Sequence, residues 1–387
     1  MDKKKILLLS LGHLSCDLNG GALPAVLPFL RDAYGLSYQA SGGLMFAYSC
    51  LSSIIQPIFG LLADRFSRPW FVPLGILLAG CGMALTGFMN TYWAIFAAIV
   101  ISGIGSSLFH PEGARHANKA AGKSKGTGLS IFSIGGNSGF VLGPLLVTAC
   151  VGLWGLSGMA VFAVLGLCTA SLLLWQICRM DRQDSHTQAG NKKYEEAGVN
   201  NWPEFAKLTG VIVSRSTLFI SFNAFIPLYW VNVFGQSKAA GALAIAIFCA
   251  SGVICNIGGG LLSDRYGYLR VIRFSFSLLP LVVLAFSQTL NIWLAYVLLP
   301  LLGCALYAPF SPIVVLGQKL LAKNIGFASG VTLGLATSVG GLATPLLGWV
   351  ADGYGLPRAV LCLTAVALLG MFFAWRLSPE AAAEKRA

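Results

Sequence analysis

Charge is what this sequence has least of. Only 10% of its 387 residues are Asp, Glu, Lys or Arg, whereas water-soluble chains carry about 25%. Hydrophobic residues make up 56% of the chain, and the mean hydropathy is +0.75. This composition excludes an ordinary soluble domain and predicts a chain embedded in lipid, where few charges are tolerated.

Catalytic and metal-binding motifs are missing as well. The sequence contains no H-E-x-x-H, no G-x-S-x-G, no Cys/His ligand spacing and no P-loop, the patterns that hydrolases, metal sites and ATP-driven proteins use. Its ten cysteines include no C-x-x-C pair and lie almost entirely inside apolar runs. We therefore expect small buried cysteines without disulfides, no metal, no cofactor and no enzymatic activity.

Apolar runs of about 20 residues, the length needed to cross a bilayer, follow one another along almost the whole chain. They predict about twelve transmembrane helices. The expected ranges are 6–30, 40–63, 70–89, 92–116, 127–150, 154–178, 205–233, 239–262, 271–288, 291–317, 327–350 and 355–376. Residues 179–203 form the only long polar stretch.

The second half of the chain repeats features of the first. The segment GLLADRF at 60–66 returns as GLLSDRY at 260–266. The matching prolines are Pro28 with Pro227 and Pro144 with Pro345. Self-similarity of this kind indicates that two structural units have been fused.

We therefore expect an all-α membrane protein with twelve transmembrane helices in two pseudo-symmetric six-helix bundles. The N-terminal bundle is predicted at 1–178, a cytoplasmic linker at 179–203 and the C-terminal bundle at 204–387. Parallel duplication places a substrate site between the halves near the membrane midplane, with transport by rocking of one half against the other. A channel would instead need pore-lining rings and repeated subunits.

Basic residues explain the formal net charge of +12. They gather before the first predicted helix, after each even-numbered helix and at the C-terminus, while the alternate loops offer only Arg31, Lys238 and Arg358. By the positive-inside rule, both termini and the middle loop are cytoplasmic. The basic residues form no patch interleaved with aromatics, so we expect no nucleic-acid partner.

The repeated loop segment resembles the cytoplasmic signature between helices 2 and 3 of the major facilitator superfamily. In that family the loop acts as a latch for the outward-open state. The resemblance assigns gating to Asp64, Arg65 and Arg68, and to Asp264 and Arg265 in the second copy. The alternative is a solvated helix cap that only sets the topology.

The predicted helix at 127–150 carries Gly135-Gly136-Asn137-Ser138-Gly139 and then Gly143-Pro144. This run is similar to the glycine-proline pattern associated with antiporters of the superfamily. Glycines four residues apart form a smooth face on which another helix can slide, and proline adds a weak point. We assign gating to Gly139, Gly143 and Pro144; plain helix packing is the alternative.

A more specific resemblance lies in the segment 103–112, GIGSSLFHPE, which is followed by Arg115 and by GLSIF at 128–132. With Gln56-Pro57, these motifs look like the fosmidomycin-resistance branch of the superfamily. The resemblance is close in the N-terminal half and looser in the C-terminal half. It implies a twelve-helix exporter, with small anionic phosphonates as the drug class of the named members.

Ionisable residues at membrane depth are functional candidates because burying them in lipid is unfavourable. Asp17 lies in the middle of the first predicted helix, and Arg215 lies at similar depth in the seventh. We predict an Asp17–Arg215 pair in which a proton on Asp17 frees Arg215 to hold an anionic substrate. Deprotonation would re-form the pair and expel the substrate. A static buried pair is the alternative.

The fourth predicted helix carries further candidates near its cytoplasmic end. Glu112 can reach Arg115 and His116 at i+3 and i+4, which favours a satisfied network within the helix. His110 lies deeper, and histidine titrates near neutral pH. It is either a second proton carrier or a structural hydrogen-bond donor, and the same holds more weakly for His13.

The residues that we assign to proton coupling are Asp17, His110 and Glu112, and those that we assign to substrate binding are Asn19, Asn137, Arg215, Asn223 and Tyr229. We expect a proton-coupled antiporter that exports a small drug or metabolite, anionic according to the resemblance, by alternating access. A proton-coupled importer of an organic anion and a transporter-derived sensor are the alternatives. We expect a monomer in the bacterial inner membrane, with small-molecule substrate, protons and the lipid bilayer as its partners.

Overall fold

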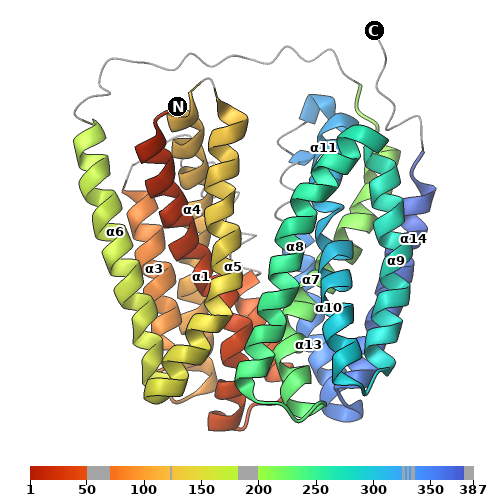
Figure 1. Cartoon of the computed structure of the whole chain (residues 1–387), viewed down its shortest axis with the longest axis horizontal. Helices are drawn as coiled ribbons and strands as arrows, with labels where there is room; N and C mark the ends of the chain where they lie inside the picture. The colour runs from red at the N-terminus through yellow and green to blue at the C-terminus, as the bar shows by residue number, and fades with distance from the viewer. Residues whose placement is uncertain are drawn as a thin grey trace. The chain divides into compact units, whose positions relative to one another are not determined.

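The computed structural model describes residues 1–49, 70–122, 124–181, 199–324, 327–328, 331–332 and 336–378 (Figure 1). Within these ranges the chain forms helices and no strand. The first helices are α1 (Lys3–Tyr34), α3 (Phe71–Leu85), α4 (Tyr92–Ala121), α5 (Lys125–Trp154) and α6 (Ala160–Asp181). The later helices are α7 (Trp202–Asn232), α8 (Lys238–Tyr266), α9 (Tyr268–Gln288), α10 (Ile292–Tyr307), α11 (Phe310–Leu320), α13 (Ala336–Tyr354) and α14 (Leu356–Arg376).

The lengths and composition of the helices fit a membrane protein. Eight described segments are long and apolar enough to cross a bilayer, and the shorter apolar helix α3 accompanies them. Several helices begin at a polar cap: the side chains of Thr91, Asn201, Ser237 and Asn291 accept hydrogen bonds from backbone N–H groups in the first turns of α4, α7, α8 and α10. Such caps satisfy N–H groups that have no partner inside the helix. The expected all-α membrane fold is confirmed.

The chain forms two compact units. Unit 1 comprises Met1–Phe29 and Ala47–Glu195, and unit 2 comprises Leu30–Phe46 and Glu196–Ala387. The two units are not simply the first and second halves of the sequence. The end of α1 and residues 35–46 belong to the first half but pack with unit 2.

In unit 1, α3 packs against α4 and α6, and α5 packs against α1. Glycines on α5 let it approach α1 closely. A Cβ atom at Gly139 would lie 2.6 Å from the backbone nitrogen of Leu18, and one at Gly143 would overlap Leu18 and Ala22. Small residues let helix backbones approach in this way in membranes. The predicted smooth face of α5 therefore faces α1.

In unit 2, α9 packs against α14, α7 against α13 and α8 against α10 (Figure 1). The side chains of Tyr229 and Trp230 on α7 are fully buried. Their rings contact Phe286 on α9 and Phe234. This aromatic cluster fills the part of unit 2 near the end of α7.

The predicted single helix at 291–317 is two helices, α10 and α11, separated by a turn at Ala308 and Pro309. Proline lacks a backbone N–H group, so it cannot donate the helical hydrogen bond to the carbonyl four residues earlier. The hydropathy pattern does not register this break because the residues on both sides are apolar.

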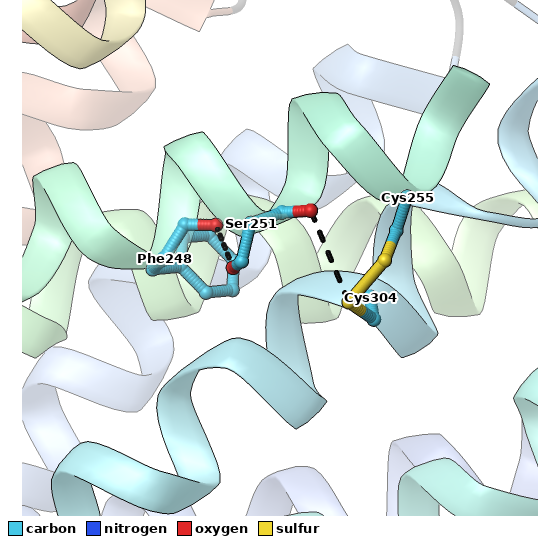
Figure 2. Close-up of a disulfide and its surroundings, with 4 residues drawn as sticks. All are labelled: Phe248, Ser251, Cys255 and Cys304. Atoms are coloured by element: carbon cyan, nitrogen blue, oxygen red, sulfur yellow. Dashed lines mark hydrogen bonds between the residues drawn. A yellow bond between two sulfur atoms is a disulfide. The ribbon is translucent and has the colours of Figure 1, made fainter. Parts of the chain in front are cut away.

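The expectation that the cysteines form no disulfide was wrong for one pair. Cys255 on α8 and Cys304 on α10 are joined by a disulfide, with their Cα atoms 4.9 Å apart (Figure 2). Beside them, the hydroxyl of Ser251 donates to the carbonyl of Phe248 at 2.9 Å. The two cysteines are 49 residues apart in sequence, so only the close packing of α8 on α10 brings them together.

Candidate functional site

The ionisable residue at the middle of α1, Asp17, lies between two histidines in unit 1. Its carboxylate oxygens are 3.1 Å from Nε2 of His13, one turn earlier on α1, and 3.0 Å from Nε2 of His110 on α4. Only 5% of Asp17 is exposed. We refer to these three residues as the Asp17 triad.

The second nitrogen of each histidine fixes where the protons lie. Nδ1 of His13 is 2.9 Å from the carbonyl oxygen of Phe132, and Nδ1 of His110 is 2.7 Å from that of Ser106. A carbonyl oxygen only accepts hydrogen bonds, so both Nδ1 atoms must carry a proton. A neutral ring would then present a bare Nε2 acceptor to the carboxylate.

Each contact of Asp17 therefore needs a further proton. An ionised carboxylate also only accepts, so a histidine whose Nε2 faces it must be an imidazolium ion, or the carboxyl group must itself be protonated. One proton on the carboxyl group can satisfy only one of the two contacts. Both contacts of the Asp17 triad can be hydrogen bonds only when two further protons are present, and the loss of one leaves two acceptors facing each other.

A glycine on α5 makes room for the triad. A Cβ atom at Gly136 would overlap Nε2 of His13 and lie 2.6 Å from Oδ2 of Asp17. The ring of His13 also stacks on that of Phe132, with the centroids 4.2 Å apart. The motif at 135–139 therefore shapes the surroundings of the triad.

Each residue of the triad offers one possible metal ligand, an imidazole nitrogen or a carboxylate oxygen. These three atoms all lie within 4.8 Å of one another, a spacing that a metal ion could also use. The two N···O distances of 3.0 and 3.1 Å are those of hydrogen bonds. A divalent ion is the alternative occupant of the positions between the carboxylate and the rings.

Glu112, the other predicted proton carrier, takes part in a different contact on α4. Its carboxylate accepts hydrogen bonds from Arg115 at 2.6 and 3.1 Å. The expected pairing of Glu112 with Arg115 within the helix is confirmed. A role for Glu112 in proton coupling stays a prediction.

The predicted anion-binding residue of unit 2, Arg215 on α7, is partly buried and donates a hydrogen bond to a backbone carbonyl. Its Nε donates to Leu306 at 2.6 Å, beside the break between α10 and α11. Its guanidinium carbon lies 4.6 Å from the ring centroid of Phe310, a cation–π distance. Among the described residues of unit 2, Arg215 contacts no carboxylate. The predicted Asp17–Arg215 pair joins the two units and stays a prediction.

The guanidinium of Arg215 keeps unused donors. A guanidinium has five N–H groups, and the bond to Leu306 uses the one on Nε. Within the described residues, the Nη groups form no hydrogen bond.

The amide and phenol candidates are largely buried. Nδ2 of Asn19 donates to the carbonyls of Ser15 and Cys16, and Nδ2 of Asn223 donates to that of Phe219. Within the described residues, Oδ1 of Asn19 and the hydroxyl of Tyr229 have no hydrogen-bond partner. Buried polar atoms are seldom left without a hydrogen bond, so we expect each of these two atoms to gain a hydrogen-bond partner. Asn137 is half-buried on α5.

The predicted gating residues are only partly within the described structure. Asp64, Arg65 and Arg68 lie outside the described residues. In the second copy of the motif, Asp264 is exposed near the end of α8, and the guanidinium of Arg265 lies 5.3 Å from the Tyr266 ring centroid. Gating by either copy, or by Gly139, Gly143 and Pro144, stays a prediction.

A second polar cluster in unit 2 surrounds the beginning of the helix at 38–49. The carboxylate of Asp352 on α13 accepts hydrogen bonds from the N–H groups of Tyr38 and Gln39 at 2.7 and 2.9 Å. Nearby, Asp32 forms an ion pair with Lys238 at 2.6 Å. We refer to the contacts of residues 30–46 with α7, α8 and α13 as the 30–46 contact. Helix packing also holds it, because a Cβ atom at Gly42 would lie 2.6 Å from the carbonyl of Thr344.

Three residues in these sites were predicted only weakly or not at all. His13 was the weaker of the two histidine candidates, although it lies four residues before Asp17 on a helix and so on the same face. Gly136 belongs to the glycine-rich motif at 135–139, but no role was predicted for it. Asp352 has no sequence signal, because its partners are more than 300 residues away.

Comparison with known proteins identifies the family of this chain. The model of the Major Facilitator Superfamily matches residues 9–345. The fosmidomycin resistance protein of Escherichia coli (strain K12) is 30% identical over 370 residues, covering 94% of this chain and 90% of that protein. The multidrug resistance protein MdtG of Yersinia enterocolitica is 26% identical over 384 residues, covering 92% of this chain and 89% of its own.

Solved structures share the fold. A bacterial homologue of the human lysosomal transporter Spinster, in an inward-facing and unoccupied conformation, superimposes with a TM-score of 0.84 at 15% identity and covers 99% of both chains. The nucleoside transporter NupG has a TM-score of 0.76, also at 15% identity, and covers 96% of this chain and 99% of its own. The resemblance to the fosmidomycin-resistance branch is confirmed by the relative from Escherichia coli. The chain therefore belongs to the major facilitator superfamily and is a multi-pass membrane transporter, not an enzyme.

Proposed function

We propose that this transporter is a proton-coupled antiporter of the bacterial inner membrane and that the Asp17 triad is its proton-binding site. The observation that carries the proposal is that both histidines of the triad present Nε2 to one buried carboxylate while Nδ1 donates to a backbone carbonyl. Such a site changes its net charge when a proton leaves. A change of charge in a buried position is a strong driving force for rearrangement.

The proposed substrate is a small anion, with phosphonates such as fosmidomycin as the first class to test. Two observations support this choice. A relative that covers nearly the whole chain is named for fosmidomycin resistance, and the Nη groups of Arg215 remain available as charged donors. Export of an anion against entry of a proton gains from the membrane potential, about 2.3 kcal/mol per charge at 100 mV.

Alternating access requires contacts that break during the cycle, and the 30–46 contact is our candidate for one of them. It combines close helix packing at Gly42 with hydrogen bonds and one ion pair. The polar contacts can exchange protein partners for water at small net cost. The polar part of the proposed gate consists of the contacts of Asp352 and the Asp32–Lys238 pair.

The direct test is the exchange of protons for substrate by the purified protein. In antiport, fosmidomycin added to wild-type protein in a weakly buffered solution should release protons, and the Asp17→Asn variant should bind fosmidomycin without releasing them. Proton uptake on binding would support the importer alternative instead. Unchanged proton release by Asp17→Asn would place the coupling proton elsewhere.

The metal alternative for the triad is tested in the same preparation. If protons occupy the site, gradient-driven transport in proteoliposomes is unchanged by EDTA, and added Zn²⁺ does not increase it. Loss of transport in EDTA with recovery on adding Zn²⁺ would assign the triad to a metal ion.

A further inference from the structure

Unit 2 has a cavity that the transport site does not use. It lies between α8, α9 and the end of α10, has a volume of about 510 Å³, and is lined almost entirely by apolar atoms. This volume falls in the range of ~300–1,000 Å³ that ligand pockets occupy. The two cysteines of the disulfide, Cys255 and Cys304, are among the residues that line it.

The cavity opens on a surface that carries exposed apolar side chains. Ile254 on α8 and Phe274 on α9 both line it, and they are 70% and 73% exposed. Both lie in helices that are long and apolar enough to cross a membrane. Side chains of this kind in such helices face lipid tails, so the cavity is a groove open to the hydrocarbon.

A charged end distinguishes this groove from an ordinary gap between helices. Arg270, in the first turn of α9, lines it and is exposed, and it makes no hydrogen bond or ion pair with any residue that the structure describes. Two more cations lie at the same corner: Arg265 against the Tyr266 ring and Lys319 against the Tyr268 ring, at 5.3 and 4.7 Å. The groove is therefore cationic at the helix ends and apolar along its length.

The length of the groove matches that of a lipid acyl chain. From Tyr266, the last residue of α8, to Ile254 is twelve residues, or ~18 Å along a helix axis. Such a groove holds much of one acyl chain while Arg270 stays at the level of the headgroups. The α8–α9 corner lies on the side that the positive-inside rule assigns to the cytoplasm, where anionic lipids attract basic residues.

We propose that this groove binds a membrane phospholipid with an acidic headgroup, its phosphate against Arg270 and one acyl chain between α8 and α9. A glycine that lines the groove provides the test. A Cβ atom at Gly258 would meet nothing within 4 Å, so Gly258→Leu adds a side chain at the groove with no clash at its Cβ atom. Gly260→Leu is the matched control, because Gly260 is equally open on the same helix but does not line the groove.

The experiment measures lipid retained by the full chain in detergent, by native mass spectrometry after addition of phosphatidylglycerol or phosphatidylcholine. We expect wild-type protein to retain phosphatidylglycerol preferentially. Gly258→Leu should lose the bound lipid while Gly260→Leu keeps it. Arg270→Gln should bind phosphatidylglycerol about fivefold more weakly, the effect of one basic residue at a lipid surface, whereas Arg376→Gln, at the end of α14, should not.

Three results would overturn the proposal. Equal retention of the two lipids by wild type would show that the groove does not select an acidic headgroup. Equal retention of phosphatidylglycerol by Gly258→Leu and Gly260→Leu would show that this lipid does not bind in the groove. Retention of a hydrophobic transport substrate in the groove in place of phosphatidylglycerol would assign the groove to substrate. Thermal melting of each variant, expected to match wild type, shows that a loss of lipid does not come from unfolding.

Discussion

In unit 1 the carboxylate of Asp17 lies between two histidine rings, whereas in unit 2 the guanidinium of Arg215 lies against a backbone carbonyl and the ring of Phe310. The partners of Asp17 are imidazole rings, which can bind or release a proton, whereas a carbonyl oxygen and a phenyl ring cannot. The repeated helices of the two halves thus carry different chemistry at these two charged residues.

The largest effect should come from removing the acid of the triad. Asp17→Asn takes away the group that both histidines face, and we expect gradient-driven transport in proteoliposomes to fall to the level of protein-free vesicles. Substrate counterflow, which needs no proton gradient, should persist. Asp2→Asn, which removes an exposed acid near the start of α1, is the control. Unchanged driven transport in Asp17→Asn would make the triad a structural feature.

The next largest effect should come from changing Arg215 in unit 2. Arg215→Ala removes the charged donors, so we expect binding of anionic substrates to weaken about tenfold or more, the value of a charge-assisted hydrogen bond. Neutral compounds should bind as before. Binding is measured by calorimetry on purified protein.

The control for Arg215 is another arginine that donates to backbone carbonyls in unit 2. Arg273 on α9 bonds the carbonyls of Ala374 and Leu377. Arg273→Ala removes a comparable structural contact without an effect on anion binding. Equal losses for anionic and neutral compounds in Arg215→Ala would indicate that Arg215 only supports the break between α10 and α11.

A smaller change crowds the triad without altering its chemistry. Gly136→Ala places a methyl group against His13 and Asp17, and overpacking of this kind costs about 1–3 kcal/mol. We expect reduced driven transport and a lower melting temperature. Gly152→Ala, on the same helix with open space around it, should behave as wild type. Equal behaviour of the two variants would contradict the close approach of α5 to the triad.

The smallest effect should come from the 30–46 contact. Asp352→Asn keeps the shape of the side chain but removes the negative charge at the beginning of the helix at 38–49, an interaction of about 0.3–1 kcal/mol. We expect amide hydrogen exchange in residues 36–46 to rise about two- to fivefold. Asp264→Asn, an exposed acid near the end of α8, provides the comparison. Exchange that stays at the wild-type rate would show that Asp352 does not hold this contact.

Hydropathy predicted the long apolar helices among the described residues because it reports the surrounding lipid directly. Most of the predicted helix at 40–63 lies outside the described residues. Hydropathy did not predict the turn at Pro309, since the flanking residues are as apolar as a continuous helix. Asp17 was identifiable because a charge at membrane depth is rare. Its partner on α4 was not, because the contact with His110 depends on how α1 and α4 are rotated against each other. That rotation comes from packing contacts such as the one at Gly136, which no local pattern contains.

Helix α1 belongs to both units: Lys3–Phe29 packs in unit 1 and Leu30–Tyr34 in unit 2. Pro28 lies two residues before Leu30, where it removes one backbone hydrogen bond and weakens the helix against bending. A bend there would let the last turn of α1 follow unit 2 while His13 and Asp17 stay with unit 1. The first helix would then act as a hinge whose two ends belong to different units.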